Sequence, residues 1–209
     1  MGAVVVKDAT GTELHRAFPA IAGERLTLTV PHAVLTRAQY PLTIDPTVGP
    51  ERSTGDPVYA AAPDTQTAPA VAWNGTDYLV VWEDLRSGNR DIYGSRLSGA
   101  GSVLDPAGIP ISTGGQHETV PQLDVRYDFL VAWRDLRFGT GYAIFATRVS
   151  PAGVVREPGG IGLTGAGTKT GVLAVTGGPG DTWGVAYERY AAESPYGANR
   201  VFLRSVSPK

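Results

Sequence analysis

Hydrophobic residues along this chain follow spacings that indicate β-strands. In residues 26–30 apolar and polar residues alternate, as in a half-buried strand, and residues 78–82 form a short apolar run rich in β-branched side chains. We find no window of about 11 residues with apolar residues at i, i+3, i+4 and i+7, the spacing of an amphipathic helix. The pattern therefore predicts an all-β chain with almost no helix.

One of these apolar runs occurs twice. Residues 80–86 (VVWEDLR) return as residues 131–137 (VAWRDLR), and the strand that follows also returns, because 91–98 (DIYGSRLS) matches 143–150 (AIFATRVS). A third, more divergent copy places Tyr187 at the tryptophan position. A period of about 50 residues, with about four short strands in each unit, is typical of stacked sheet modules of the propeller kind.

The clearest local signal is the segment 73–78 (WNGTDY). Asn-Gly between two apolar strands favours a tight hairpin because both residues tolerate positive φ. Residues 126–128 (RYD) and the longer, glycine-rich 176–181 (TGGPGD) stand at the same place in the next two copies. We therefore expect antiparallel pairing at the start of each repeat.

Composition divides the chain into three regions. The first carries short predicted strands at 3–7, 26–30 and 41–44 and a reverse turn at 8–11, and the second is rich in Pro, Gly, Ala and Thr. The predicted boundaries are a small N-terminal β module at 1–47, a linker or extended segment at 48–66, and repeats at about 67–116, 117–166 and 167–209.

Three repeats do not make a closed ring, since propellers typically use 4 to 8 blades. Either the N-terminal region adds a sheet, or the array belongs to a longer repeat protein, or several chains complete a ring. The predicted fold is thus a partial or oligomer-completed β-propeller of about three blades, preceded by a small β module.

The sequence of these repeats resembles that of a known group of proteins. The segments VAWNGTDYLVVWED, DIYGSR and LDPAGIPIS are similar to repeats of large proteins exported by myxobacteria and related bacteria, and residues 40–46 (YPLTIDP) resemble the end of a β module that precedes such repeats. The resemblance covers nearly the whole chain. It implies a propeller fold and an extracellular or cell-surface location, and that group carries no agreed activity to transfer.

The repeated Trp-x-Asp-x-Arg element is the best candidate for chemistry. In a strand, residues i, i+2 and i+4 project from one face, so a carboxylate and a guanidinium would lie beside an indole, as in many sugar sites. The alternative is structural: a Trp packed between sheets and an Asp–Arg pair that ties a loop. The candidate ligand-binding residues are Trp82, Asp84, Arg86, Tyr93, Trp133, Asp135, Arg137 and Tyr142.

Other chemistry has little support in the sequence. A net charge of −2 without any basic cluster argues against nucleic acid, and no apolar run is long enough to insert into a membrane. Cysteine is absent, and His15, His32 and His117 are scattered, so we predict no catalytic residue, metal site or cofactor. Structural calcium in the loop 84–91 (DLRSGNRD) is a weaker alternative, since two arginines share that loop.

These observations leave three functions open. The first is an extracellular binding or adhesion module that recognises a glycan or a surface protein through loops on the rim. The second is a structural repeat protein that self-associates into a ring or filament. The third is a polysaccharide-active enzyme of the propeller type, because fold does not fix function.

Overall fold

A computed structural model of the chain describes residues 4–18, 20–22, 25–46, 64–193 and 197–208. It divides into two compact units, residues 1–52 and 53–209. The predicted linker falls almost entirely outside the described residues.

The first unit is a small β module. Its central strand β1 (Val4–Lys7) pairs antiparallel with β2 (Glu13–Ala17) on one side and β5 (Thr43–Pro46) on the other, and β3 (Ala20–Ala22) forms a hairpin with β4 (Arg25–Thr27). The strand predicted at 26–30 ends early, at Thr27. The short helix α1 (His32–Leu35) follows at once.

The predicted turn at 8–11 is confirmed. Gly11 N–H donates to the Asp8 carbonyl (2.9 Å), and Asp8 Oδ1 accepts from the backbone N–H groups of Thr10 and Thr12 at 2.9 and 3.0 Å. Gly11 has a φ of 83°, a value that glycine adopts at little cost. The turn delivers β2 back onto β1, whose Val4, Val5 and Val6 are buried.

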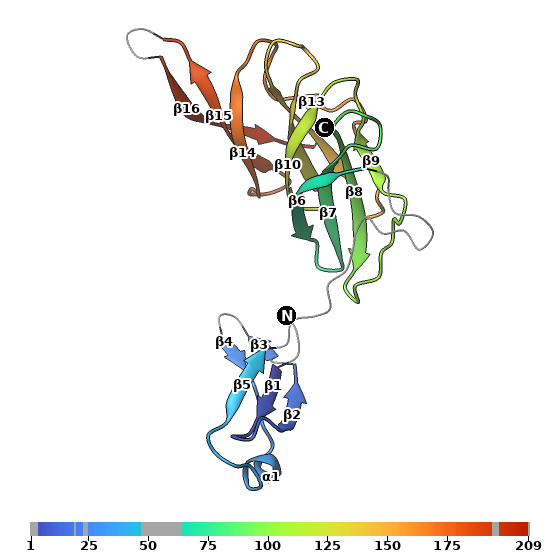
Figure 1. The fold of residues 1–209 in the computed structure, drawn as a ribbon. Helices are drawn as coiled ribbons and strands as arrows, with labels where there is room; N and C mark the ends of the chain where they lie inside the picture. Colours follow the sequence, from blue (N-terminus) through green and yellow to red (C-terminus); the bar gives the residue numbers. More distant parts are fainter. Residues whose placement is uncertain (1–3, 19, 23–24, 47–63, 194–196, 209) are drawn as a thin grey trace. The chain divides into compact units, whose positions relative to one another are not determined.

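The second unit consists of three antiparallel sheets in which each strand pairs with the one before it (Figure 1). Sheets 1 and 2 have four strands and sheet 3 has three. Their strands are, for sheet 1, β6 (Gln66–Trp73), β7 (Asp77–Asp84), β8 (Asp91–Ser98) and β9 (Ile109–Ser112); for sheet 2, β10 (Glu118–Val125), β11 (Phe129–Asp135), β12 (Ala143–Val149) and β13 (Ile161–Gly162); for sheet 3, β14 (Thr170–Gly177), β15 (Trp183–Ala191) and β16 (Ala198–Val206). The all-β prediction is confirmed.

Pairing registers show which residues correspond between sheets. Trp82 lies opposite Tyr93 in sheet 1, Trp133 opposite Phe145 in sheet 2, and Tyr187 opposite Phe202 in sheet 3. Sheet 3 therefore has Tyr187 at the position that a tryptophan holds in sheets 1 and 2. Counting outward from these pairs gives the equivalent residues used below.

The predicted hairpins are present, although the first one closes by a different mechanism. Gly75 has a positive φ of 97°, but Asn74 does not. Asn74 instead caps the turn, because its Oδ1 accepts from Thr76 and Asp77 N–H at 2.9 and 2.8 Å. This Asx-type arrangement needs positive φ at the glycine alone.

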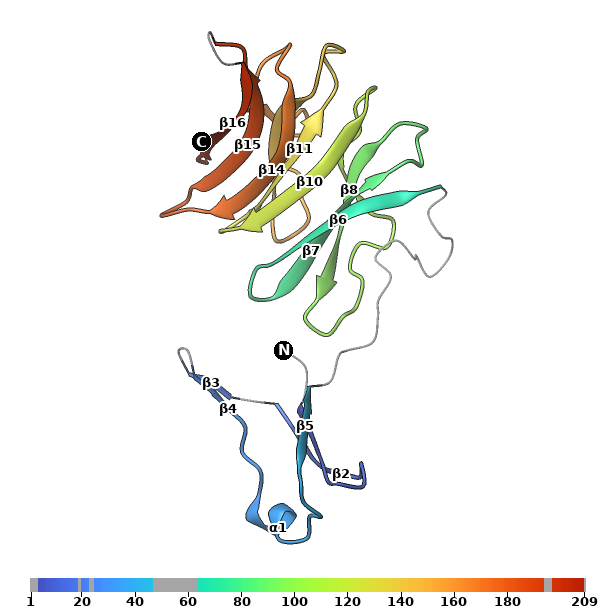
Figure 2. The same cartoon turned by 60° about the vertical axis from the view of Figure 1, so that its left-hand side comes forward.

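The sheets pack face to face around two apolar cores. The first lies between sheets 1 and 2 and contains Leu79, Val81 and Ile92 against Val131 and Trp133. The second lies between sheets 2 and 3, where Leu130, Ala132 and Ile144 meet Trp183 and Val185. Figure 2 shows β6, β10 and β14 in succession, and β10 contacts both of the others.

Each first strand carries a β-bulge near the same place, which begins one residue earlier in sheet 3. The register with the second strand shifts between Thr67 and Ala70, between Thr119 and Gln122, and between Thr170 and Leu173. Two of the bulged residues are strained, since Ala68 and Val120 have φ of 51° and 54°, values that residues with a Cβ rarely adopt.

Candidate functional site

The first Trp–Asp–Arg element forms a closed hydrogen-bond network around the Asp84 carboxylate. Asp84 Oδ1 accepts from Arg86 N and Nε at 3.0 and 2.8 Å, and Oδ2 accepts from Trp82 Nε1 at 2.9 Å, from Arg86 Nη2 at 2.6 Å and from Gln66 Nε2 at 3.1 Å. Arg86 Nη1 continues to the Ala107 carbonyl. The carboxylate is fully buried.

The second element repeats this geometry in sheet 2. Asp135 Oδ2 accepts from Trp133 Nε1 at 2.9 Å and from Arg137 Nη2 at 2.5 Å, while Oδ1 accepts from Arg137 N at 2.8 Å. Arg137 Nη1 donates to the Gly159 carbonyl (2.8 Å), as Arg86 does to Ala107. In both sheets the trio joins the end of the second strand to the loop before the fourth.

The expectation that all three residues project from one strand is wrong. Strands β7 and β11 end at Asp84 and Asp135, and each arginine lies two residues farther on, in a turn. The aspartate accepts the arginine's backbone N–H as well as its guanidinium, so the chain folds back at this point. A carboxylate whose two oxygens accept these hydrogen bonds stabilises the loop that follows its own strand.

An aromatic ring lies below the guanidinium in every sheet. Arg86 Cζ is 4.1 Å from the centroid of the Tyr93 ring, and Arg137 Cζ is 3.7 Å from that of Phe145. Sequence reasoning missed Phe145, although its alignment with Tyr93 was visible. In sheet 3 the aspartate position holds Arg189, which lies over Phe202 at 4.0 Å and so keeps the stacked pair.

The eight predicted ligand-binding residues therefore fall into two places. Trp82, Asp84, Arg86 and Tyr93 come together in sheet 1, and Trp133, Asp135 and Arg137 come together in sheet 2. Tyr142 is separate from the second group and stacks with Arg134, whose Cζ lies 4.1 Å from its ring centroid.

These contacts shift the pKa values of Asp84, Arg86 and Tyr93. Burial acts to raise the pKa of Asp84, but the hydrogen bonds from Arg86 and Trp82 outweigh it, so the pKa lies below its usual value. The same hydrogen bond from Arg86 to Asp84 raises the pKa of Arg86, and burial raises the pKa of the Tyr93 hydroxyl. Asp84 and Arg86 therefore form a stable ion pair at neutral pH.

Three further carboxylates are buried, which the sequence did not predict. Glu83 reaches from sheet 1 to sheet 2, where its Oε1 accepts from Val120 N–H at 2.8 Å. Asp91 Oδ1 and Glu118 Oε2 are buried and have no hydrogen-bond partner in the structure. Burial raises the pKa of Glu118 to about 7, with the charges of Asp135 and Asp91 acting in the same direction. Nothing in their sequence context distinguishes these residues from surface acids.

The loop considered for calcium is held together by other bonds. Asp84 is bound by Arg86, and Asp91 Oδ2 accepts from Ser87 Oγ at 2.6 Å. Within the described ranges, no group of three or more His, Asp or Glu residues is arranged to hold a metal ion.

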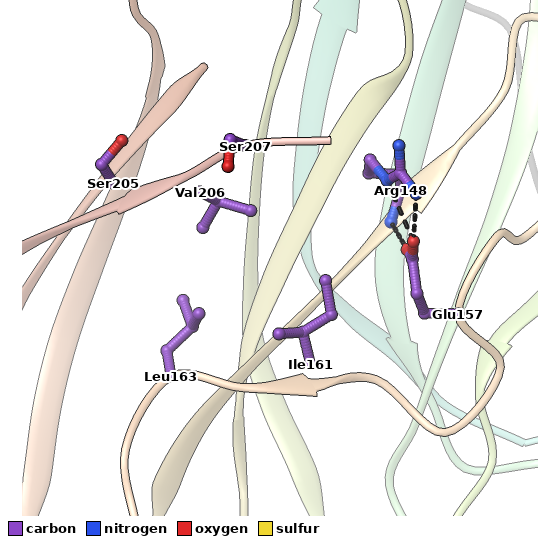
Figure 3. A pocket seen from close by; sticks show the side chains of 7 residues that line it. All are labelled: Arg148, Glu157, Ile161, Leu163, Ser205, Val206 and Ser207. Carbon is purple, nitrogen blue, oxygen red and sulfur yellow. Dashed lines mark hydrogen bonds and ion pairs between the residues drawn. The ribbon is translucent and has the colours of Figure 1, made fainter. Parts of the chain in front are cut away.

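One concavity of the second unit lies between β12, β13 and β16 (Figure 3). Ile161, Leu163 and Val206 form its apolar side, and the ion pair of Arg148 with Glu157 closes its polar side.

The first pair of sheets explains this hollow. There Arg96, the equivalent of Arg148, donates to the Pro151 carbonyl at 2.9 Å, and Val155 from the same turn packs into the core. The hollow therefore occupies the place that a turn fills one repeat earlier, and the repeat geometry accounts for it without a ligand.

No family model matches the chain, and no significant match was found among curated proteins. In the part of the chain that the structure describes, no helix is long and apolar enough to span a bilayer.

Proposed function

We propose that this chain is a structural repeat protein, in which the three sheets are successive blades of a β-propeller-type array that associates through its end sheets. Three features support the blade assignment: each sheet is a local meander, the sheets pack face to face, and the first strands follow one another in space (Figure 2). We also propose that the protein is exported, as the resemblance of its repeat sequence to exported proteins implies.

The observation that carries this proposal is the apolar character of both end faces. Sheet 1 exposes Val71, Trp73 and Tyr78 on the side away from sheet 2, and sheet 3 exposes Val201 and Leu203 on the side away from sheet 2. Apolar patches of this kind mark interaction surfaces in soluble proteins. The Trp–Asp–Arg elements, by contrast, direct their polar groups inward and stabilise the loops.

Solution mass tests the proposal. Sedimentation velocity of the full chain over a range of concentrations should show concentration-dependent association. Val201→Glu, which places a charge on the exposed face of sheet 3, should weaken association. Val154→Glu, at an exposed position in a turn of sheet 2, is the matched control and should not. A chain that stays monomeric at every concentration contradicts the proposal.

A second candidate is recognition of a glycan or surface protein by the loops. It is favoured by Tyr127 and Phe138, two exposed aromatic side chains at the tips of loops in sheet 2. A glycan array with wild type and a Tyr127→Ala, Phe138→Ala double variant tests it. Binding that the double variant loses supports recognition, and an array silent for wild type contradicts its glycan form.

A further inference from the structure

We infer that the open face of sheet 3 docks onto the open face of sheet 1 of a second copy, in the same front-to-back register that joins the sheets inside one chain. The inference rests on the proposed association and adds the identity of the partner surface. It follows from comparing equivalent residues at the ends and in the interior of the stack.

The back face of sheet 3 has the positions of an internal interface. By register, Val201 corresponds to Ile144 and Ile92, and Leu203 corresponds to Ala146. Val201 and Leu203 are 77% and 71% exposed, whereas Ile144, Ile92 and Ala146 are 0% exposed because the next sheet covers them. Sheet 3 thus has apolar residues at positions that are buried in sheets 1 and 2, and no described part of the chain covers them.

The front face of sheet 1 shows the complementary case. Tyr78 corresponds to Phe129 and Trp183, the large residues that cover the preceding sheet. Tyr78 is 39% exposed, and its ring contacts that of Trp73 in a tilted arrangement, with 4.5 Å between the ring centroids. Phe129 and Trp183 are buried. The front face of a sheet, which covers the preceding sheet, carries the large aromatic side chains, and the back face carries smaller aliphatic ones. A front face therefore fits a back face better than it fits another front face.

A polar contact supports the same pairing independently. Between sheets 1 and 2, Glu83 accepts a hydrogen bond from the N–H of Val120, a bulge residue with φ of 54°. Glu188 corresponds to Glu83 and lies on the open back face, over Gly171 of its own sheet. Ala68 corresponds to Val120 and has nearly the same φ, 51°.

Val172 corresponds to Ala68 and Val120 but does not have a positive φ, and it is exposed. Ala68 therefore shares its backbone geometry with Val120, the residue whose N–H meets Glu83. In the docked arrangement Glu188 of one copy accepts from Ala68 N–H of the next.

Front-to-back contact is heterologous, so copies join head to tail. Two copies would place six sheets in one array, a number within the range of closed propellers. An isologous dimer would instead bring two front faces or two back faces together, and this difference can be measured.

Single-cysteine variants separate the two arrangements, because the chain has no cysteine of its own. Val71→Cys marks the front face of sheet 1, Leu203→Cys marks the back face of sheet 3, and Ser102→Cys in an exposed turn is the control. Each is treated with a short bismaleimide, alone and in pairwise mixtures. Front-to-back docking predicts an intermolecular product between copies only when Val71→Cys and Leu203→Cys are mixed.

A product from either face variant alone, or a mixture that associates by sedimentation without cross-linking, overturns the inference while leaving the proposed association in place. A chain that is monomeric throughout overturns both. A second measurement uses Glu188→Ala, which should raise the dissociation constant about tenfold, the loss of one charge-assisted hydrogen bond. An unchanged constant also counts against the register.

Discussion

Replacing the Asp84 carboxylate by an amide is the most direct test of the brace at the end of β7. Asp84→Asn keeps the size of the side chain but leaves one acceptor oxygen for five donor contacts. If the amide oxygen replaces Oδ2, the amide nitrogen faces Arg86 N and Nε, two donors. If it replaces Oδ1, the nitrogen faces Trp82 Nε1 and two further donors. At least two hydrogen bonds are lost in either orientation.

The expected cost follows from burial. Hydrogen bonds to an ionised group contribute about 1.5–3 kcal/mol each, and Arg86, which is partly exposed, can recover some of this from water. We expect Asp84→Asn to lower the free energy of unfolding by about 2–4 kcal/mol. For a unit of this size that corresponds to a fall in Tm of about 4–16 °C.

Urea denaturation followed by tryptophan fluorescence measures this loss, with Asp181→Asn in an exposed turn as the control that should stay within about 0.5 kcal/mol of wild type. The pKa of Asp84 is lowered in the fold, so its stabilisation is present above its usual value of 3.8 and is lost as the pH falls through the folded-state pKa. The gap between wild type and Asp84→Asn should therefore close in acid. A variant as stable as wild type at pH 7 would refute the brace.

Three further predictions concern stability and binding. Because burial raises the pKa of Glu118 to about 7, the free energy of unfolding of the wild type should fall as the pH rises from about 4.5 to 7. Glu118→Gln should remove this pH dependence and be the more stable protein at pH 8. Urea titrations that give both proteins the same pH dependence would contradict this prediction. Ala68→Gly should raise the free energy of unfolding by about 1 kcal/mol, since Ala68 is exposed and has a positive φ, and a loss of stability would show that the residue is not strained. Asp135→Asn should lower stability without changing any glycan-array signal, and a lost signal at unchanged stability would assign Asp135 to a ligand instead.

The strands were predictable from the sequence because their signals are local. The duplicated tryptophan segments align Trp82 with Trp133 without reference to a structure, and Tyr187 pairs with Phe202 as Trp82 pairs with Tyr93. The end of the strand at Asp84 was not predictable by periodicity. The Asx-type turn competes with strand extension there, and its outcome depends on a carboxylate that also binds an indole and a guanidinium.

The buried acids were harder to predict. Glu83, Asp91 and Glu118 belong to residue types that are usually exposed, and the folded structure buries all three. Their local sequence gives no sign of it. The stacked arginine in sheet 3 was also not predictable, because Arg189 stands at the aspartate position and lies over the ring of Phe202 without an aspartate partner at that position.

The local meander of each sheet has a consequence for how such a chain changes length. In the second unit every sheet is drawn from one contiguous stretch, and the chain passes from the last strand of one sheet to the first strand of the next. Duplicating a stretch of about 50 residues therefore adds one front face and one back face together. The added sheet packs between its neighbours and leaves the two end sheets of the stack unchanged. The gene can therefore gain or lose whole repeats while the exposed faces of the end sheets stay complementary.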